Sequence, residues 1–430
     1  MFARFSRRTA IGSLSSVLLF GVACSDSLTP PLGPTSDVEL SASEGRGVLH
    51  RYVAIGTSIS MGWASDGVLA SSQRRSWPVQ LAQLGGRDLT TPDIEFPGCR
   101  SPLMAPLASN RRLSGVPAGL DASLFTCAPL VPGTELPPQN LAISTATTYD
   151  ALYVTPELQH DVFYSKLYPR VLPPGMTQVS AMMAQNPKLV SVELGGNEVL
   201  NARDGSAIEG VTMYPYALWA PLYDAVLDSV QKTTKMAVVV GLTNDVRDMP
   251  AFRSGAELWS ERNTFLGAFN VAVSADCQNS ENMLFVPVRV PVAVGTGLAL
   301  RAAGQGPYVL SCAASPNPLT KEYVLDPAEV QRVNDLMARM DAHIRSEAQR
   351  RGLAYFRLGD LYERADVKPP FNAIAFMTSD TPYGPLISLD GIHPSAAGST
   401  VLADAAARAL NARYLLGIPV SATFLTAAAF

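Results

Sequence analysis

The sequence predicts an α/β protein, a three-layer αβα sandwich whose central, mainly parallel sheet has about five strands. Short, almost continuously apolar runs alternate along the chain with longer segments of helical periodicity. The intervals between successive runs all exceed the dozen residues that a crossover between parallel strands needs. We therefore expect parallel pairing, with helices covering both faces of the sheet.

The predicted strands are apolar along nearly their whole length, which is typical of strands buried on both faces. They are VLHRYVAIG (48–56), KLVSVEL (188–194), KMAVVVGL (235–242), MLFVPVRV (283–290) and LAYFRLG (353–359). Three predicted helices carry apolar residues at intervals of three and four, with charged residues on the other face. These helices span 216–233, 326–352 and 395–414.

Four long segments interrupt this alternation, and all are rich in Pro and Gly. They are 97–138, 156–175, 291–320 and 366–388. Loops of this length in a compact domain are usually functional, and ligands of open parallel sheets bind at the carboxyl ends of the strands. We expect these loops to cover that edge, with apolar side chains that either line an acyl groove or pack the loops onto the core. The candidates are Leu103, Met104, Leu107, Phe371, Phe376 and Met377.

The N-terminus has the order of an export signal, with basic residues ahead of a short apolar run. Residues 1–23 are predicted to be a signal peptide, and Cys24 follows small residues as in a bacterial lipobox. Gly21 replaces the leucine usual at its position, so both lipid attachment at Cys24 and plain secretion remain open. Residues 24–47 have the composition of a disordered tether, and 417–430 form a C-terminal tail. The expected location is the cell envelope, the periplasm or the medium.

Charge excludes a nucleic-acid partner. The chain has 33 basic and 37 acidic residues, a formal balance of -4. Removal of residues 1–23 takes away three arginines and no acid, which leaves 30 basic residues against 37 acidic ones, or -7. No basic surface is expected that would hold a phosphate backbone. The only membrane contact that we predict is the lipid on Cys24, and we expect a monomer.

Four cysteines remain after Cys24, an even number in an oxidising compartment. They are Cys99, Cys127, Cys277 and Cys312, and none has the CxxC spacing of a metal or redox site. Two disulfides between sequence neighbours, Cys99 with Cys127 and Cys277 with Cys312, are the natural expectation, although four cysteines allow three connectivities.

Four histidines limit the search for a general base, and His393 differs from the other three. It lies in the turn SLDGIHPSAAG, three residues after Asp390. An aspartate at this spacing is able to hydrogen-bond the imidazole, fix its tautomer and stabilise the imidazolium. DxxH is common by itself, and a capping aspartate beside an incidental histidine explains it equally well.

A candidate nucleophile follows the first predicted strand, where VLHRYVAIG runs into TSISMGW. A serine hydroxyl reacts only when it is held rigidly beside a base and an anion-stabilising pocket. Ser58 has that placement, and Ser60 is the competing candidate. After the second strand, LGGNEVLNA presents Asn197, whose amide is able to donate to an oxyanion, beside Gly195 and Gly196. A simple turn explains each segment when it is taken alone.

Together, in this order, the segments resemble the blocks of the SGNH hydrolases, also called GDSL lipases and esterases, over about 48–416. The family's first block, Gly-Asp-Ser-Leu, is similar to Gly56-Thr57-Ser58-Ile59. Its third block, Gly-x-Asn-Asp, is similar to Gly195-Gly196-Asn197-Glu198. Its fifth block, Asp-x-x-His, is similar to Asp390-Gly391-Ile392-His393. NLAISTATTYDAL resembles the second block, Asn-x-Ala-x-x-Gly-Ala, with Thr145 at the glycine position. The resemblance implies a flavodoxin-like sheet and a serine ester hydrolase without cofactor or metal.

The resemblance implies that Ser58 is the nucleophile, that His393 is the base and that Asp390 is the partner of His393. It also implies an oxyanion hole formed by Ser58, Thr145 and Asn197. The substrate would then contact Gly195 and Gly196. The sequence departs from the family's blocks at Thr57, Thr145 and Glu198, where the family has Asp, Gly and Asp. None of these replacements removes a reacting group. Threonine keeps the backbone N–H of the family's glycine but demands other torsions and narrows the pocket.

The expected substrate is a small-molecule ester, lipid or short acyl. The alternatives are a carbohydrate O-acetyl esterase and a surface binding protein that kept the fold without turnover. An α/β-hydrolase is disfavoured because no Gly-x-Ser-x-Gly elbow surrounds Ser58 and because its acid normally comes from a separate loop.

Overall fold

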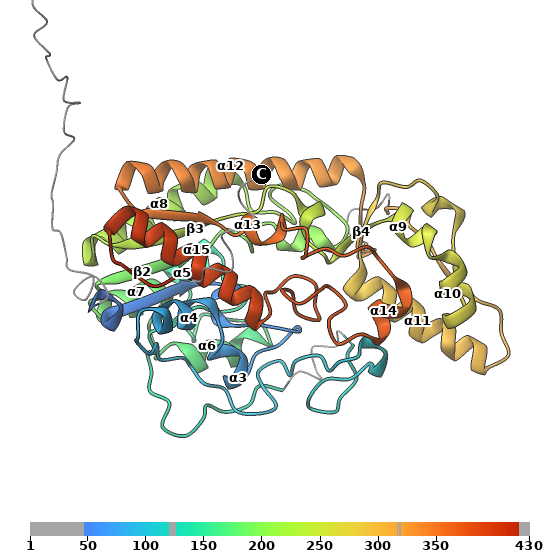
Figure 1. Ribbon diagram of the computed structural model, residues 1–430, viewed down its shortest axis with the longest axis horizontal. Coiled ribbons are helices and arrows are strands. Elements are labelled where there is room, and N and C mark those ends of the chain that lie inside the picture. The colour runs from blue at the N-terminus through green and yellow to red at the C-terminus, as the bar shows by residue number, and fades with distance from the viewer. Residues whose placement is uncertain (1–46, 120–125, 316, 318–319, 421–430) are drawn as a thin grey trace, which may run out of the picture. The chain divides into compact units, whose positions relative to one another are not determined.

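Four parallel strands form the main sheet, in the order β1-β2-β3-β9. Their bounds are β1 Tyr52–Gly56, β2 Leu189–Glu193, β3 Ala237–Gly241 and β9 Ala354–Arg357. The computed structural model describes residues 47–119, 126–315, 317 and 320–420, all within one unit that runs from Leu40 to Phe430 (Figure 1). The predicted signal peptide, Cys24, nearly all of the tether and the tail beyond residue 420 lie outside the described residues.

The prediction of about five strands is corrected to four. Residues 139–143 run beside β1, where Ala54 N–H donates to Gln139 O, and Leu141 N–H and Ile143 N–H donate to the carbonyls of Ala54 and Gly56. This segment forms only an isolated parallel bridge, between Ala54 and Asn140. It nevertheless brings the second sequence block to the carboxyl end of β1.

The predicted strand 283–290 is wrong. Only β6, Met283–Phe285, is extended, and it belongs to a separate antiparallel sheet of order β4-β6-β8, in which β4 is Phe252–Ser254 and β8 is Val324–Leu325. Helix α11 begins at Val286 and continues to Ala302, so the first part of the predicted loop 291–320 is helical as well. Pro287 lies in the first turn of α11, where the missing N–H costs no hydrogen bond.

Side chains alternate between the two faces of the main sheet, and each face has its own core. Val53 and Ile55 of β1 face one core, while Tyr52 and Ala54 face the other. The first core is covered by α5 (Thr148–Tyr153), α7 (Gln178–Ala184), α8 (Tyr216–Thr233) and α12 (Pro327–Arg351). The second is covered by α4 (Trp77–Leu84) and α15 (Ala396–Tyr414). Helices therefore pack on both faces of the sheet.

The three predicted helices are confirmed as α8, α12 and α15. Their ends follow local chemistry. Asp326 accepts a hydrogen bond from Glu329 N–H at the start of α12, and Gly352 ends that helix with φ +67°. The Ser395 side chain accepts from the N–H groups of Ala397 and Gly398 at the start of α15, and this helix begins three residues after His393.

A group of shorter elements lies apart from the main sheet, at the right of Figure 1. It comprises α9 (Gly255–Ser260), α10 (Arg262–Phe269), α11, α14 (Ala373–Thr378) and the parallel pair β5 (Val271–Val273) and β7 (Tyr308–Leu310). The disulfide between Cys277 and Cys312 crosses it, and the second disulfide joins Cys99 to Cys127. Both predicted pairings are confirmed.

The remaining elements are short. They are β4 (Phe252–Ser254), β8 (Val324–Leu325), α2 (Ser58–Met61), α3 (Ala70–Gln73), α6 (Tyr164–Val171), α13 (Gly359–Tyr362) and the 3-10 helices Val48–Arg51, Leu107–Ser109, Leu200–Asp204, Val246–Asp248 and Ala275–Cys277. Helices thus also occur in the predicted loops 97–138, 156–175 and 366–388. Within the described parts of the chain, no helix is both long and apolar enough to cross a membrane.

Candidate active site

Ser58 is the first residue of α2 and follows β1 after a single intervening residue. Gly56, the last residue of β1, lies so close to β2 that a Cβ atom there would approach Glu193 O and Ser60 Oγ to 2.9 Å. Only glycine fits this position without displacement. The tight crossing holds Ser58 at the carboxyl edge of the sheet, at the start of a helical turn.

Ser58, His393 and Asp390 form a continuous hydrogen-bonded chain. Ser58 Oγ lies 2.8 Å from His393 Nε2, and His393 Nδ1 lies 2.9 Å from Asp390 Oδ2. The structure therefore brings together residues that are 335 positions apart in the sequence. This geometry allows the imidazole to accept the serine proton while the carboxylate fixes the ring tautomer.

Asp390 is buried and surrounded by donors. Its Oδ1 accepts from the N–H groups of Ile392 and His393, each at 2.9 Å, and its Oδ2 accepts from Asp66 N–H at 2.7 Å. Burial by itself raises the pKa of Asp390, but the charge of His393 and the hydrogen bonds from His393 and Asp66 lower it to about 2. The carboxylate is thus ionised at neutral pH.

A buried arginine holds the turn that supports Asp390. The Asp66 carboxylate lies 2.7 Å from Arg112 Nη2 and 2.9 Å from Arg100 Nη1. Arg112 is 1% exposed and also donates to the carbonyl groups of Asp66 and Ser101. The pairing of Arg112 with Asp66 was not identified from the sequence. This pairing joins two loops, and neither residue belongs to a periodic pattern.

Ser60, the competing nucleophile, has a structural environment. It is fully buried, donates to Glu193 Oε2 at 2.9 Å and accepts from Trp77 Nε1 at 3.0 Å. Glu193 also accepts from the N–H and the hydroxyl of Thr57. Burial raises the pKa of Glu193, and hydrogen bonds from the N–H and hydroxyl groups of both Thr57 and Ser60 oppose the rise. Ser60 and Thr57 therefore anchor the end of β1 to the end of β2.

The predicted oxyanion donors lie on adjoining segments. Among the described residues, no acceptor hydrogen-bonds the backbone N–H of Ser58 or Thr145. Thr145 lies two residues beyond Ile143, which donates to Gly56 O. Asn197 Nδ2 donates to Ala146 O at 2.8 Å, so one amide proton fixes the neighbouring loop and the other stays available.

Thr145 adopts φ +63°, the left-handed region that glycine enters without cost. Its hydroxyl donates to Ser144 O at 2.7 Å. The backbone thus keeps a glycine-like conformation although a β-branched residue occupies the position. A left-handed conformation of a non-glycine residue costs about 1–3 kcal/mol and is often found at functional sites.

Gly195 and Gly196 differ in their surroundings. Gly195 has φ +116° and packs against Met340 and Leu242, whereas Gly196 lines the cavity that contains Ser58. Glu198, two residues after Gly196, is buried, and its Oε1 accepts from Thr148 N–H at 2.7 Å. Burial raises the pKa of Glu198 to about 7, which the hydrogen bonds from Thr148 only partly oppose.

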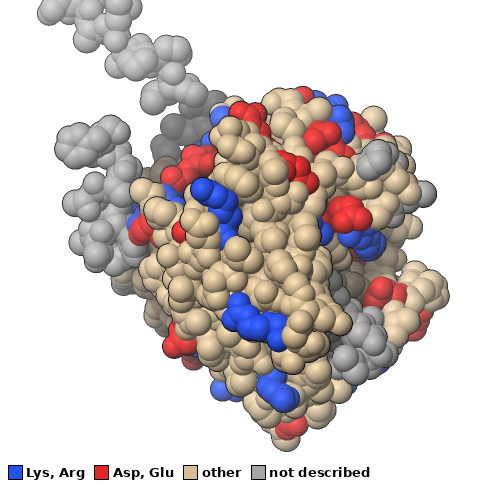
Figure 2. Space-filling model, turned by 90° about the vertical axis from the view of Figure 1, so that its right-hand side faces the viewer, with Lys and Arg blue, Asp and Glu red and all other residues tan. Residues whose placement is uncertain are grey.

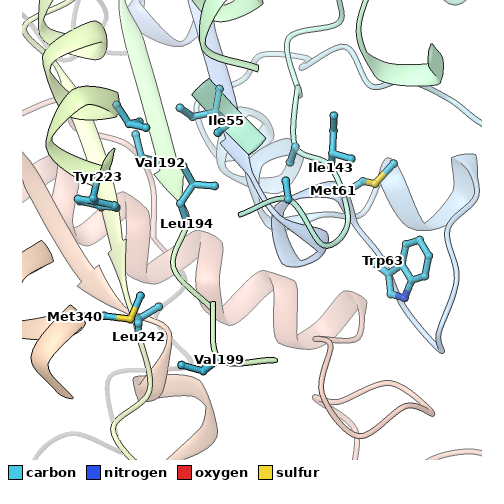
Figure 3. Close-up of a cluster of buried hydrophobic side chains, with 14 of the residues drawn as sticks. Ile55, Met61, Trp63, Ile143, Val192, Leu194, Val199, Tyr223, Leu242 and Met340 are labelled. Atoms are coloured by element: carbon cyan, nitrogen blue, oxygen red, sulfur yellow. The ribbon is translucent and has the colours of Figure 1, made fainter. Parts of the chain in front are cut away.

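An apolar cavity of about 90 Å³ opens beside Ser58 and His393. Its walls come from the loops after β2 and β3 and from α12, and include Leu194, Val199, Leu242, Met249, Val333 and Met337. Figure 3 shows Leu194, Val199 and Leu242 where these strands end. The sequence missed this cavity, since its residues come from segments far apart in the chain.

The loop residues that we considered for an acyl groove lie elsewhere. Leu107, Phe376 and Met377 are buried in the second core, where Phe371 and Leu103 pack against them. None of the six candidate side chains lines the cavity beside Ser58. Five of the six join the long loops to the core, which was the alternative interpretation; they are Leu103, Leu107, Phe371, Phe376 and Met377.

Among the described residues, the one cluster with metal-ligand atom types is Asp276 with Cys277 and Cys312. Its two sulfur atoms form a disulfide and offer no thiolate. Asp276 instead accepts from Cys312 N–H and from the Ser311 hydroxyl. This cluster does not fit a metal ion.

The model of the GDSL-like lipase/acylhydrolase family matches residues 52–406, most of the chain. A structural comparison found similarity to a mutant of Axe2, an acetyl-xylooligosaccharide esterase from Geobacillus Stearmophilus. Sequence identity is 12% and the TM-score is 0.32, over 84% of this chain and 93% of that chain. A sequence search among curated proteins found no match. By the family match, the chain belongs to the GDSL-like lipases and acylhydrolases.

Proposed function

We propose that this chain is a serine ester hydrolase that works through an acyl-enzyme intermediate. The observation that carries the proposal is the hydrogen-bonded chain Ser58–His393–Asp390 at the mouth of an apolar cavity. Ser58 Oγ attacks the ester carbonyl carbon while His393 Nε2 accepts the serine proton. The imidazolium, stabilised by Asp390, then protonates the departing alcohol, and water releases the acid by the same route.

The oxyanion of each tetrahedral intermediate needs donors beside Ser58. We assign this role to the backbone N–H groups of Ser58 and Thr145 and to the second amide proton of Asn197. Their fixed orientation supports the assignment, because preorganised donors stabilise developing charge without reorganisation. Gly196, which lines the cavity, is the glycine that we assign to substrate contact; Gly195 supports it from behind.

The cavity favours an apolar acyl group over acetate as the preferred substrate. Its walls are mostly aliphatic, and each methylene that they bury contributes about 0.8 kcal/mol, about fourfold in kcat/KM. We therefore propose lipid or medium-chain acyl esters as the substrate class. A series of p-nitrophenyl esters from acetate to dodecanoate tests this, and a kcat/KM that is highest for acetate would exclude it.

Covalent labelling tests the nucleophile. A fluorophosphonate should label the parent protein on the peptide that contains Ser58, and Ser58→Ala should abolish both labelling and ester hydrolysis. Ser60→Ala is the matched control, two residues away: it should lower stability, because Glu193 and Trp77 lose a partner, yet keep the label. Equal labelling of Ser58→Ala and the parent would refute the assignment, and no labelling of the parent would support a binding protein.

We also propose that the protein is exported and acts as a monomer. The two disulfides support an oxidising compartment. Membrane attachment through Cys24 is tested by metabolic labelling with a fatty acid, which should be lost in Cys24→Ser.

A further inference from the structure

Helix α11 exposes an apolar face to solvent. Its buried positions are Val286, Val290, Ala293, Val294 and Gly297, which follow helical spacing along one side. The exposed positions are Val292, Gly295, Thr296, Leu298 and Ala299, and no charged residue occurs between Val290 and Leu300. A surface helix normally presents charged and polar residues there. Between Val290 and Leu300, the exposed side of the helix is thus apolar apart from Thr296.

Neighbouring elements extend this face. Gly297 lies so close to the end of α10 that a Cβ atom would approach Phe269 O to 2.5 Å, so the two helices touch. Arg301 of α11 donates to the carbonyl groups of the last residues of α10, from Leu266 onward. Four large apolar side chains of α10, α11 and β7 are 43–60% exposed: Leu266, Val292, Leu298 and Val309. We call the exposed residues of these three elements the α10–α11 face.

The charged residues within α10, α11 and β7 are all basic. They are Arg262, Arg289 and Arg301; Arg289 forms an ion pair with Glu322, and Glu261 directly precedes α10. The elements α10, α11 and β7 contain no acid at all. Figure 2 views the molecule from this side and shows a wide uncharged area with isolated basic side chains, while acidic side chains lie mainly toward its margins.

We infer that the α10–α11 face binds the surface of a membrane that contains anionic phospholipids. An exposed apolar helix flanked by arginines has the features of a helix that lies in the lipid headgroup region. A second copy of the chain fits less well, because two such faces would bring Arg262 and Arg301 of both copies together with no acid to pair them. The inference concerns binding and holds whether or not Ser58 is the nucleophile.

A local probe tests the inference in the full chain. Val292→Trp places an indole at an exposed position of α11, and Leu218→Trp does the same on α8, which lies at the far end of the molecule in Figure 1. The two native side chains are matched in exposure, 57% and 58%. Emission is recorded as a difference from the parent protein, with vesicles of phosphatidylcholine alone, with added phosphatidylglycerol, and with brominated phosphatidylcholine. Any binding by residues 1–46 is common to both variants.

We expect the emission of Val292→Trp to shift to the blue and to be quenched by bromine, while Leu218→Trp stays unchanged. Arg262 and Arg301 should make binding to phosphatidylglycerol vesicles about 30-fold tighter than to phosphatidylcholine alone, an advantage lost at high salt. No shift, or equal shifts in both variants, would overturn the inference. A shift that depends on protein concentration without vesicles, with a doubled mass in light scattering, would overturn it in favour of a dimer.

Discussion

Glu198 should make the stability of the protein depend on pH in a way that one substitution removes. Its carboxyl group is buried, Oε1 is held by Thr148 N–H, and Oε2 has no hydrogen-bond partner among the described residues. Burial raises the pKa of this group from 4.5 to about 7 in the folded protein. Folding therefore favours the protonated form, and the ionised form destabilises the native state.

The sign and size of the change in the free energy of unfolding with pH follow from the shift in the pKa of Glu198 between the unfolded and folded states. Below pH 4.5 the carboxyl is protonated in both states and costs nothing. Between pH 4.5 and about 7 the unfolded state loses its proton first, so the free energy of unfolding falls by about 1.4 kcal/mol for each unit of pH. Above pH 7 the loss is complete, at about 3 kcal/mol. Glu198→Gln keeps the acceptor for Thr148 but carries no charge at any pH.

Urea unfolding of the parent and Glu198→Gln at pH 4.5, 6 and 8, followed by tryptophan fluorescence, measures this effect. The variant should match the parent at pH 4.5 and exceed it by about 3 kcal/mol at pH 8. Glu347→Gln is the control of opposite sign, because hydrogen bonds from Arg350 and Arg351 lower the pKa of Glu347 to about 2. Because this stabilisation is lost only between pH 4.5 and about 2, that variant should be less stable than the parent by a nearly constant amount at pH 4.5, 6 and 8. Parallel curves for Glu198→Gln and the parent across this range would refute the reasoning.

Two further predictions concern the support of the site. Arg112→Met should lower the free energy of unfolding by about 3–5 kcal/mol, since it removes a buried partner of Asp66, and it should reduce kcat more than it raises KM. Arg112→Lys should recover part of the stability and part of kcat. An unchanged kcat in Arg112→Met would contradict a link between Arg112 and Asp390. Thr145→Gly should be about 1 kcal/mol more stable than Thr145→Ala in thermal unfolding. Both variants lose the hydroxyl, but only alanine keeps a Cβ atom at φ +63°. Equal stabilities of the two variants would contradict the left-handed conformation of residue 145.

Local patterns predicted much of the fold. Helices α8, α12 and α15 were predicted nearly to the residue, because amphipathic periodicity and capping residues are encoded within each segment. Helix α11 was missed because its valine-rich start resembles a buried strand. The helical spacing of its buried residues appears only when the segment is followed past Val290 to Gly297.

The site was predictable only in part, for a related reason. Ser58, Asn197 and the Asp390–His393 turn follow recognisable motifs, and the structure brings Ser58, Asp390 and His393 together. Arg112 carries no such signal, since its role depends on a contact with Asp66 across two irregular loops. The cavity walls likewise combine short segments whose proximity only the tertiary fold creates.

The distance in sequence between Ser58 and His393 has a consequence for folding. The pair forms only when the turn before α15 reaches the end of β1, and α15 itself packs on α4 and β9. Long-range contacts of this kind form late, because the loop-closure entropy of the whole intervening chain opposes them. In a nascent or truncated chain that lacks α15, nothing holds the turn with His393 beside Ser58. Hydrolysis would therefore begin only after the last helix has docked, and turnover would report the completion of folding.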